Sequence, residues 1–256
     1  LRPDNFTPPS RTPWGGRYIR GRYKQSLHLS PGEPVVGEAW EVSVEPNFPS
    51  RTADDDSPLP AVIASRPDAW LGNRASQTSL LVKFLDAAQN LSVQVHPHDD
   101  DKTLAAHESG KPEAWIVLRA DPGAGIYLGF KDVVSESDVE RCIDEGGALD
   151  ALMNFVAVEP GDAFVIAAGT AHAIGAGLTL LEPQIVRPGR EGVTYRYWDW
   201  NRRYDAAGVL SPSGEPRALH AQRSIAVTDW SRPLGNAFVA ACRVVPSLIS
   251  DRHLTW

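Results

Sequence analysis

Residues 91–98 of the chain read LSVQVHPH. Apolar residues at positions 91, 93 and 95 alternate with polar ones, and this period of two is typical of a β-strand with two unlike faces. Gln94 and His96 then point to the same side of the strand. An amide oxygen and an imidazole two residues apart can reach one cation, so the stretch predicts a strand that presents two metal ligands.

Two later segments could complete the ligand set. Residues 110–115 read GKPEAW and place Glu113 at the start of an apolar strand, and residues 169–174 read GTAHAI and deliver His172 after a turn. Nitrogen and oxygen ligands of this kind suit zinc or a similar divalent ion. From the residues alone, each of these side chains could equally be an ordinary surface or core residue.

The neighbourhood of His172 favours the metal site. Gly161 follows a turn, residues 163–168 read as a buried strand, and Gly169 begins a second turn just before His172. This spacing resembles the second motif of the cupin barrels. The chain departs from the usual form in having Ala167 where proline is common.

A narrower resemblance emerges from several blocks taken in order. The blocks are LLVKFLDA at 80–87, NLSVQVHP at 90–97, GKPEAW at 110–115 and AGTAHA at 168–173, with WGG at 14–16 and GEAWEVS at 37–43 upstream. Together they resemble type I mannose-6-phosphate isomerase. The resemblance implies an enzyme that interconverts mannose 6-phosphate and fructose 6-phosphate through an enediol, with one zinc ion per chain.

The resemblance also selects the metal ligands. It implies the set Gln94, His96, Glu113 and His172. The alternative ligand His98 shares the His-x-His spacing with His96, but Pro97 ends the strand and leaves the direction of His98 open. We therefore expect Gln94 and His96 to act together, with His98 as the second choice.

Further residues are expected to act on the substrate. A lysine inside an apolar strand, such as Lys83, needs an anionic partner or a route to water, and in the family the matching lysine lines the substrate pocket. We expect Lys83, Ser92 and Lys111 to bind substrate. Glu182 is the first candidate for the base, Lys111 the second, and Arg196 supplies a cation for the enediolate.

The expected fold is mainly β: a cupin (jelly-roll) β-barrel in a catalytic domain of residues 1–236, with helical insertions at about 100–110 and 132–154. In detail, we expect a helix from Asp99 to Ser109, a capping box at Ser137, and a strand over 238–245. Residues 1–13 read as a disordered tail. Residues 237–256, with a strand opening at Leu248, are expected to begin a second, truncated cupin-like domain.

Composition narrows the class of protein. The chain has 256 residues, 42% of them hydrophobic, and a formal net charge of −7, which argues against nucleic acid as the main partner. No apolar run reaches the length of a membrane span. Two cysteines make no disulfide framework, so we expect a cytoplasmic protein, monomeric or weakly homo-oligomeric, that acts on a small sugar phosphate.

Two other functions fit the same barrel. A metal cupin with oxygenase or decarboxylase chemistry would prefer iron or manganese and would not need Lys83, Lys111 and Arg196. A non-catalytic sugar-binding cupin would keep the pocket without the metal. Between residues 182 and 196, Arg187 and Arg190 either contact phosphate or solvate a loop, and we favour the loop.

Overall fold

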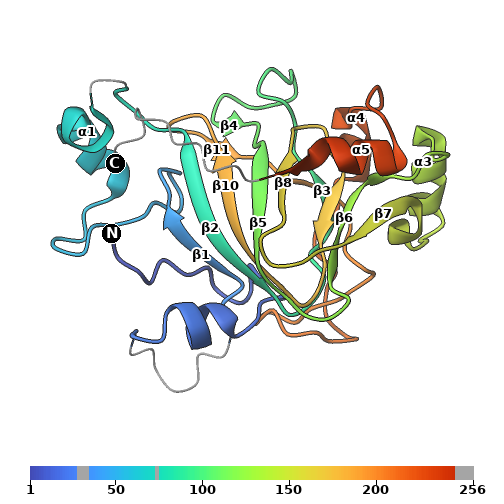
Figure 1. The fold of residues 1–256 in the computed structure, drawn as a ribbon, viewed down its shortest axis with the longest axis horizontal. Coiled ribbons are helices and arrows are strands. Elements are labelled where there is room, and N and C mark those ends of the chain that lie inside the picture. Colours follow the sequence, from blue (N-terminus) through green and yellow to red (C-terminus); the bar gives the residue numbers. More distant parts are fainter. Residues whose placement is uncertain (28–34, 73–74, 246–256) are drawn as a thin grey trace.

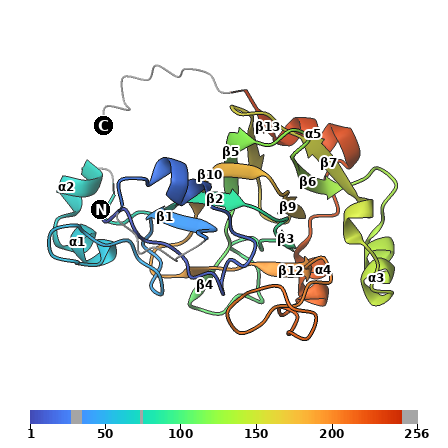
Figure 2. The same cartoon turned by 90° about the horizontal axis from the view of Figure 1, so that it is seen from below.

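The computed structural model describes residues 1–27, 35–72 and 75–245 of the chain. Two large β-sheets pack face to face, and the helices lie at the periphery (Figures 1 and 2). This arrangement confirms the expected mainly β class and is the two-sheet form of a jelly roll.

The first sheet has the strand order β1-β2-β10-β5-β8-β13, and every neighbouring pair in it is antiparallel. Its centre is formed by three eight-residue strands from distant parts of the chain, and the middle one, β10, pairs with β2 on one side and with β5 on the other. The strands are β1 (Glu38–Val42), β2 (Leu80–Ala87), β10 (Leu178–Ile185), β5 (Glu113–Ala120), β8 (Ala163–Ile166) and β13 (Arg243–Val244).

The second sheet has the order β12-β3-β9-β6-β7 and carries most of the predicted ligands. Its strands are β12 (Tyr195–Trp198), β3 (Val93–Val95), β9 (His172–Ile174), β6 (Gly125–Phe130) and β7 (Met153–Ala157). A separate parallel pair joins β4 (Glu108–Ser109) to β11 (Glu191–Gly192).

Both faces of the second sheet are buried, and this determines where its polar residues point. On the outer face, Val93 and Val95 belong to a core cluster that also contains Val139 of α3 (Glu136–Asp144) and Ile225 of α4 (Ala221–Val227). The alternate residues of β3 therefore face the space between the sheets. Gln94 is on that inner face, so the alternating pattern predicted the strand correctly.

A second core cluster fills part of the space between the sheets. Trp115 and Leu180 from the six-stranded sheet pack there with Ile126 and Leu128 from the five-stranded sheet. All four side chains are almost fully buried. This apolar region closes one end of the sandwich and leaves polar side chains at the other end, where the cavity described below is found.

Short helices surround the sheets. They are the π-helix η1 (Ile19–Tyr23), α1 (Leu59–Ser65), α2 (Pro67–Leu71) and the 3-10 helix η3 (Leu149–Leu152), in addition to α3 and α4. The helical insertion expected at about 132–154 is confirmed by α3 and η3. Its capping box lies two residues earlier than expected: Ser135 Oγ accepts from the Asp138 backbone N–H, and the Asp138 carboxylate accepts from the Ser135 N–H.

The helix expected from Asp99 to Ser109 was wrong. This segment is a series of turns that ends in β4. Asp101 instead closes a local turn by accepting from the Thr103 N–H at 2.8 Å, and Asp99 accepts from the Gly110 N–H at 2.9 Å, across the whole segment. Short acidic side chains compete with helix in this way.

The strand expected over 238–245 was also wrong for most of its length. Residues Gly235–Cys242 form helix α5, and only β13 follows as a two-residue strand. Phe238 and Cys242 of α5 join the core cluster between the sheets. The start of a second domain at residue 237 stays a prediction, because the strand expected at Leu248 lies outside the described residues.

The N-terminal arm is ordered along β1 and is not the disordered tail that we expected. The Thr7 N–H donates to the Glu38 carbonyl, and Asn5 and Trp40 exchange hydrogen bonds. Thr12 is 2% exposed and packs against Gly37. The arm therefore holds its last residues beside the sheet, and one of them, Arg11, lines the cavity described below.

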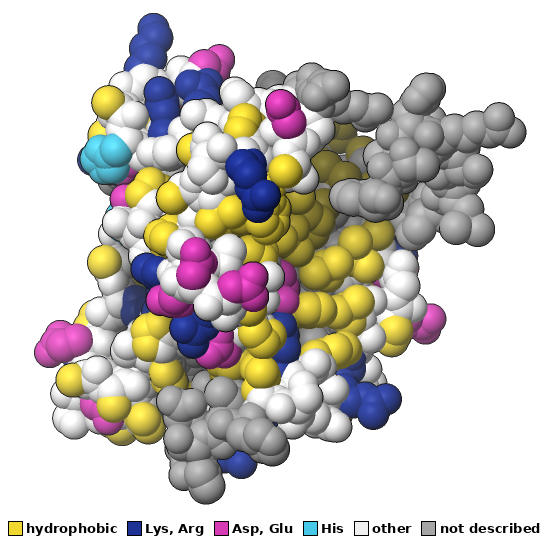
Figure 3. Space-filling model, turned by 90° about the vertical axis from the view of Figure 1, so that its left-hand side faces the viewer, with side chains coloured by type: hydrophobic (Ala, Val, Ile, Leu, Met, Phe, Trp, Pro, Cys, Tyr) yellow, Lys and Arg dark blue, Asp and Glu magenta, His cyan; other side chains and the backbone are white. Residues whose placement is uncertain are grey.

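Hydrophobic side chains are also visible on the outside of the molecule. Figure 3 shows them gathered on one side of the face that it draws. The exposed apolar residues include Leu80, Val165 and Ile185, which occupy positions on the outer face of the six-stranded sheet. In the part of the chain that the structure describes, no helix has the length and apolar character needed to cross a bilayer.

Candidate active site

Three of the four predicted metal ligands converge between the sheets. His96 follows β3, Glu113 begins β5 and His172 begins β9. The Nε2 atoms of His96 and His172 lie 3.1 and 3.4 Å from the two carboxylate oxygens of Glu113. All three residues are buried, with 4% exposure or less. These residues form a His-Glu-His group of the size that holds one metal ion.

The hydrogen bonds of the two imidazoles show that the group fits a cation. His96 Nδ1 lies 3.0 Å from the Val193 carbonyl, and His172 Nδ1 lies 2.8 Å from the Thr170 carbonyl. A carbonyl only accepts, so the proton of each ring belongs on Nδ1. Burial lowers the pKa of His96 to about 3, helped by Lys111, and burial also lowers the pKa of His172. Both rings are therefore neutral.

A neutral ring with its proton on Nδ1 has a lone pair on Nε2. Both Nε2 atoms are buried without a hydrogen-bond partner among the described residues, and both face Glu113. Burial raises the pKa of Glu113, but the positive charge that His96 and His172 carry at low pH, together with that of Lys111, lowers it by more. The carboxylate is therefore ionised at neutral pH, where both rings are neutral. Two lone pairs and a carboxylate that face one another without a proton between them are an arrangement that a cation would stabilise.

Two residues that sequence reasoning missed fix the Glu113 carboxylate. Gln184 Nε2 donates to Oε2 at 2.6 Å, and Trp115 Nε1 donates to Oε1 at 3.0 Å and also to Glu182 at 3.2 Å. The alternation of side chains along a strand could have identified both residues. Trp115 is two residues after Glu113, and Gln184 is two residues after Glu182, so each pair shares one face of its strand.

The other predicted and alternative ligands differ in position. Gln94 lies opposite His172 across the β3–β9 pair and lines the cavity next to the group. His98 is exposed and lies outside the three-residue group. The structure therefore places Gln94, and not His98, on the side of the strand where His96 lies.

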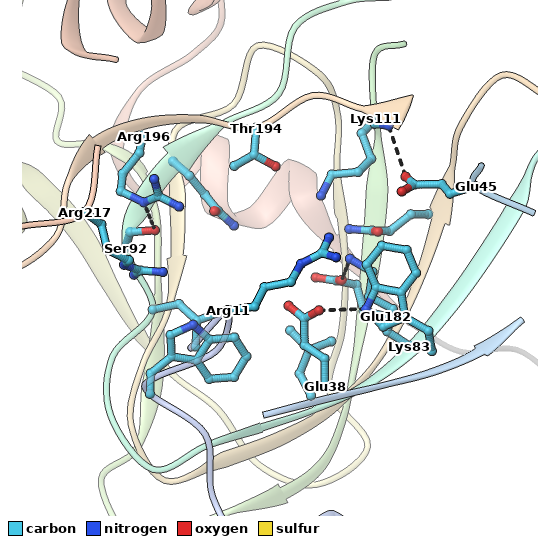
Figure 4. A pocket seen from close by; sticks show the side chains of 17 residues that line it. Arg11, Glu38, Glu45, Lys83, Ser92, Lys111, Glu182, Thr194, Arg196 and Arg217 are labelled. Carbon is cyan, nitrogen blue, oxygen red and sulfur yellow. Dashed lines mark hydrogen bonds and ion pairs between the residues drawn. The ribbon is translucent and has the colours of Figure 1, made fainter. Parts of the chain in front are cut away.

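A cavity of about 280 Å³ opens beside the His-Glu-His group (Figure 4). Its walls carry five cationic side chains and three carboxylates, together with Trp14, Trp40, Ser92, Gln94 and Thr194 among others. The cations are Arg11, Lys83, Lys111, Arg196 and Arg217, and the carboxylates are Glu38, Glu45 and Glu182. The excess of two positive charges is complementary to a dianionic ligand.

One wall of the cavity carries acidic and basic side chains that lie close together and change one another's pKa. Lys83 Nζ lies 3.6 Å from Glu182 and 4.4 Å from the centre of the Trp40 ring. Burial lowers the pKa of Lys83, but Glu38, Glu182 and Glu45 raise it by more. Burial and the nearby Glu113 charge raise the pKa of Glu182 to about 8. A carboxyl group that titrates near neutral pH suits proton transfer.

Lys111 enters the same region from the loop before β5. Its side chain is 7% exposed and points into the cavity in Figure 4. Burial and the neighbouring Lys83 lower the pKa of Lys111. A buried amine with a lowered pKa is easier to deprotonate than a free one, which fits a role in acid–base chemistry.

The opposite wall carries a guanidinium held by polar contacts. Arg196 Nε donates to Ser92 Oγ at 3.0 Å, and its Nη1 donates to the Ala218 carbonyl at 2.8 Å. Burial and the neighbouring Arg217 lower the pKa of Arg196 to about 10. Arg217 itself forms a two-pronged ion pair with Asp199, at 2.7 Å for each contact.

All the predicted substrate and catalytic residues thus line this one cavity: Lys83, Ser92, Lys111, Glu182 and Arg196. Arg187 and Arg190, whose role the sequence left open, do not line the cavity. Arg187 pairs with Asp99 at 3.2 Å and is 43% exposed, and Arg190 donates to the Glu108 carbonyl. Sequence reasoning missed Arg11 and Glu45, because their positions depend on how the N-terminal arm and the residues after β1 pack.

Comparisons with known proteins agree with this geometry. Residues 10–118 match the family model for the phosphomannose isomerase type I catalytic domain. A mannose-6-phosphate isomerase from Streptococcus mutans serotype c is 35% identical over 223 residues, which cover 86% of this chain and 65% of that protein. The chain thus spans just under two thirds of the length of this relative.

Solved structures have the same fold. The mannose 6-phosphate isomerase from Bacillus subtilis has a TM-score of 0.69 and 26% identity, over 87% of this chain and 67% of the other. A mannose 6-phosphate isomerase bound with zinc and yttrium has a TM-score of 0.59 over 91% and 75% of the two chains. At 16% identity, it supports the fold alone. The chain is thus similar to type I phosphomannose isomerases, over residues 10–118 in the family model and over most of its length in these relatives.

Proposed function

We propose that this protein is a metal-dependent aldose–ketose isomerase that interconverts mannose 6-phosphate and fructose 6-phosphate through an enediol. The observation that carries the proposal is the buried His-Glu-His group beside a cationic cavity, next to the cavity residue Gln184. The similarity to mannose-6-phosphate isomerases supports the choice of substrate. A phosphate monoester carries a charge near −2 at neutral pH, which matches the excess positive charge of the cavity.

We propose zinc as the metal and Gln94, His96, Glu113 and His172 as its ligands. The neutral imidazoles and the ionised carboxylate of the described group suit zinc. The related structure described as bound with zinc and yttrium is consistent with this choice. When bound, zinc would stabilise negative charge on the substrate oxygens.

The isomerisation needs a base that moves a proton between two carbons. We assign this role to Glu182, with Lys111 as the alternative. The base removes the C2 proton of the open-chain aldehyde and returns it to C1, while a proton passes from O2 to O1. The raised pKa of Glu182, about 8, keeps the carboxyl near balance between its acid and base forms.

The remaining residues bind the substrate and its developing charge. We assign Arg196 to the enediolate, because Ser92 and the Ala218 carbonyl hold its guanidinium in place without neutralising it. Lys83, Ser92 and Lys111 are assigned to substrate binding. The two free cysteines fit the cytoplasmic location that the sequence predicts, and a monomer or weak oligomer remains the predicted state.

A coupled assay tests the proposed function. The purified chain should convert mannose 6-phosphate to fructose 6-phosphate, and Glu113→Gln should abolish this activity. Glu159→Gln, a change of the same kind on an exposed turn, is the matched control and should remain active. A wild-type protein that binds the sugar phosphate without converting it would contradict the proposal and favour a sugar-binding role. Bound iron or manganese without isomerisation would favour another metal cupin.

A further inference from the structure

The side chain of Arg11 occupies the cavity without a charged partner. Its guanidinium carbon lies 4.9 Å from the centre of the Trp40 ring and 5.6 Å from that of Phe48. Within residues 1–27, 35–72 and 75–245, no carboxylate lies within ion-pair distance of it. Figure 4 shows the side chain extending into the cavity from the arm.

The backbone holds Arg11 in this place. The Arg11 N–H donates to the Pro8 carbonyl at 2.9 Å, and the next residue, Thr12, is buried against Gly37. Thr12 Oγ1 also lies 3.2 Å from the hydroxyl of Thr7. A turn anchored on both sides reduces the freedom of the side chain that it carries, so Arg11 is positioned and not merely solvated.

Three of the other four cations of the cavity are partly or fully neutralised, and Arg196 is the exception. Lys83 has Glu182 at 3.6 Å, and Arg217 has both prongs on Asp199. Lys111 is surrounded by the charges of Glu113, Glu182 and Glu45. An incoming anion would therefore find its strongest uncompensated attraction at the guanidinium groups that lack an acid.

Arg11 and Lys83 lie at the same wall. Both cations contact the Trp40 ring, at 4.9 and 4.4 Å from its centre, so they are no farther apart than the sum of these distances. Trp40 is itself fixed, because its Nε1 donates to Glu38 at 2.7 Å. A phosphate group placed at this wall could contact Arg11 from the open side, where Arg11 is exposed.

We infer that Arg11 binds the phosphate group of the substrate and makes the cavity select phosphorylated over neutral sugars. This inference rests on the proposed function for the identity of the sugar, but the anion site itself is independent of turnover. Guanidinium groups suit the site because they bind phosphate oxygens through two parallel hydrogen bonds.

Steady-state kinetics of Arg11→Gln test the inference. We expect the KM for mannose 6-phosphate and the inhibition constant for inorganic phosphate each to rise by about ten-fold or more, with kcat within about three-fold of wild type. Arg11→Lys should show a smaller rise. Arg17→Gln, which removes an exposed arginine six residues later and outside the cavity, is the matched control and should change neither value.

Calorimetry with inorganic phosphate separates this inference from the proposed function. If the wild type binds phosphate and Arg11→Gln weakens the binding, Arg11 is confirmed even in a protein without isomerase activity. Unchanged phosphate affinity in Arg11→Gln, or a wild type that does not bind phosphate, would overturn the inference. If Arg11→Gln fails to fold, the comparison of Arg11→Lys with wild type decides, and equal phosphate affinities would overturn it.

Discussion

At the scale of single residues, the chemistry depends on how burial changes the charge of a few side chains. Glu113 and Glu182 lie on neighbouring strands and share the Trp115 indole as a hydrogen-bond donor. Yet the pKa of Glu113 is lowered and that of Glu182 is raised to about 8. Two carboxyl groups whose pKa values are shifted in opposite directions can have different roles: one stays an anion, and the other accepts and donates a proton.

The raised pKa of Glu182 predicts the pH dependence of activity. The base form of a carboxyl becomes populated as pH rises through its pKa. The kcat/KM of the wild type should therefore increase from about pH 7 to about pH 9 and then level off. Initial rates in overlapping buffers measure this. A flat profile across that interval would exclude Glu182 as the titrating base.

Arg196 gives a second prediction at the same scale. Its pKa of about 10 leaves the guanidinium charged at neutral pH. Arg196→Ala should lower kcat by about 100-fold or more if the side chain stabilises the enediolate as we propose, and metal content should stay unchanged because Arg196 lies outside the His-Glu-His group. Arg196→Lys, which keeps the charge, should retain more activity. Unchanged turnover in Arg196→Ala would remove this residue from the mechanism.

Residues that act through local pattern could be predicted from the sequence, and those that depend on distant packing could not. The period of two around Gln94 and His96 identified their common side correctly, and Glu113 and His172 were found from their strand starts. Arg11 was missed because only tertiary packing brings the arm to Trp40. A proline-rich segment without periodicity gives no such signal.

At the scale of elements, most strands were predicted and the errors concern short helices. The acidic run after His98 looked like a helix start, but Asp101 closes a local turn and Asp99 accepts from the Gly110 N–H instead. Helix α5 was read as a strand because its apolar residues form a short continuous run, a pattern that does not distinguish a buried strand from a buried helix. Neither error displaced a predicted site residue.

The capping box of α3 gives a prediction for one element. Ser135→Ala removes the side chain that accepts from the Asp138 N–H, and should lower the free energy of unfolding by about 1 kcal/mol. Isomerase activity should not change, because α3 lies on the outer face of the five-stranded sheet. Urea unfolding measures the effect. Ser137→Ala is the matched control, and a larger loss there would contradict the assignment of Ser135 as the cap.

At the scale of the whole molecule, the His-Glu-His group connects the two sheets. Glu113 belongs to the six-stranded sheet, and His172 belongs to the five-stranded sheet. An ion held by both should stabilise the packing of one sheet on the other. Binding to the folded state alone adds about 4 kcal/mol when the free metal is a thousand-fold above its dissociation constant.

Thermal unfolding with and without a chelator tests this link. Removing the metal should lower the Tm of the wild type by several degrees, since about 1 kcal/mol corresponds to about 2–4 °C in a chain of this size. His172→Asn should start with a lower Tm and show little further change with the chelator. An equal chelator effect in both proteins would mean that the stabilising ion is bound elsewhere.

The most direct test of the metal site is the metal content of the purified protein. After dialysis against zinc and then against metal-free buffer, the wild type should retain about one zinc ion per chain, as a site built from several protein ligands predicts. Glu113→Gln and His172→Asn should retain almost none, whereas Glu159→Gln should match the wild type. Equal zinc content in all four proteins, or none in the wild type, would contradict the account.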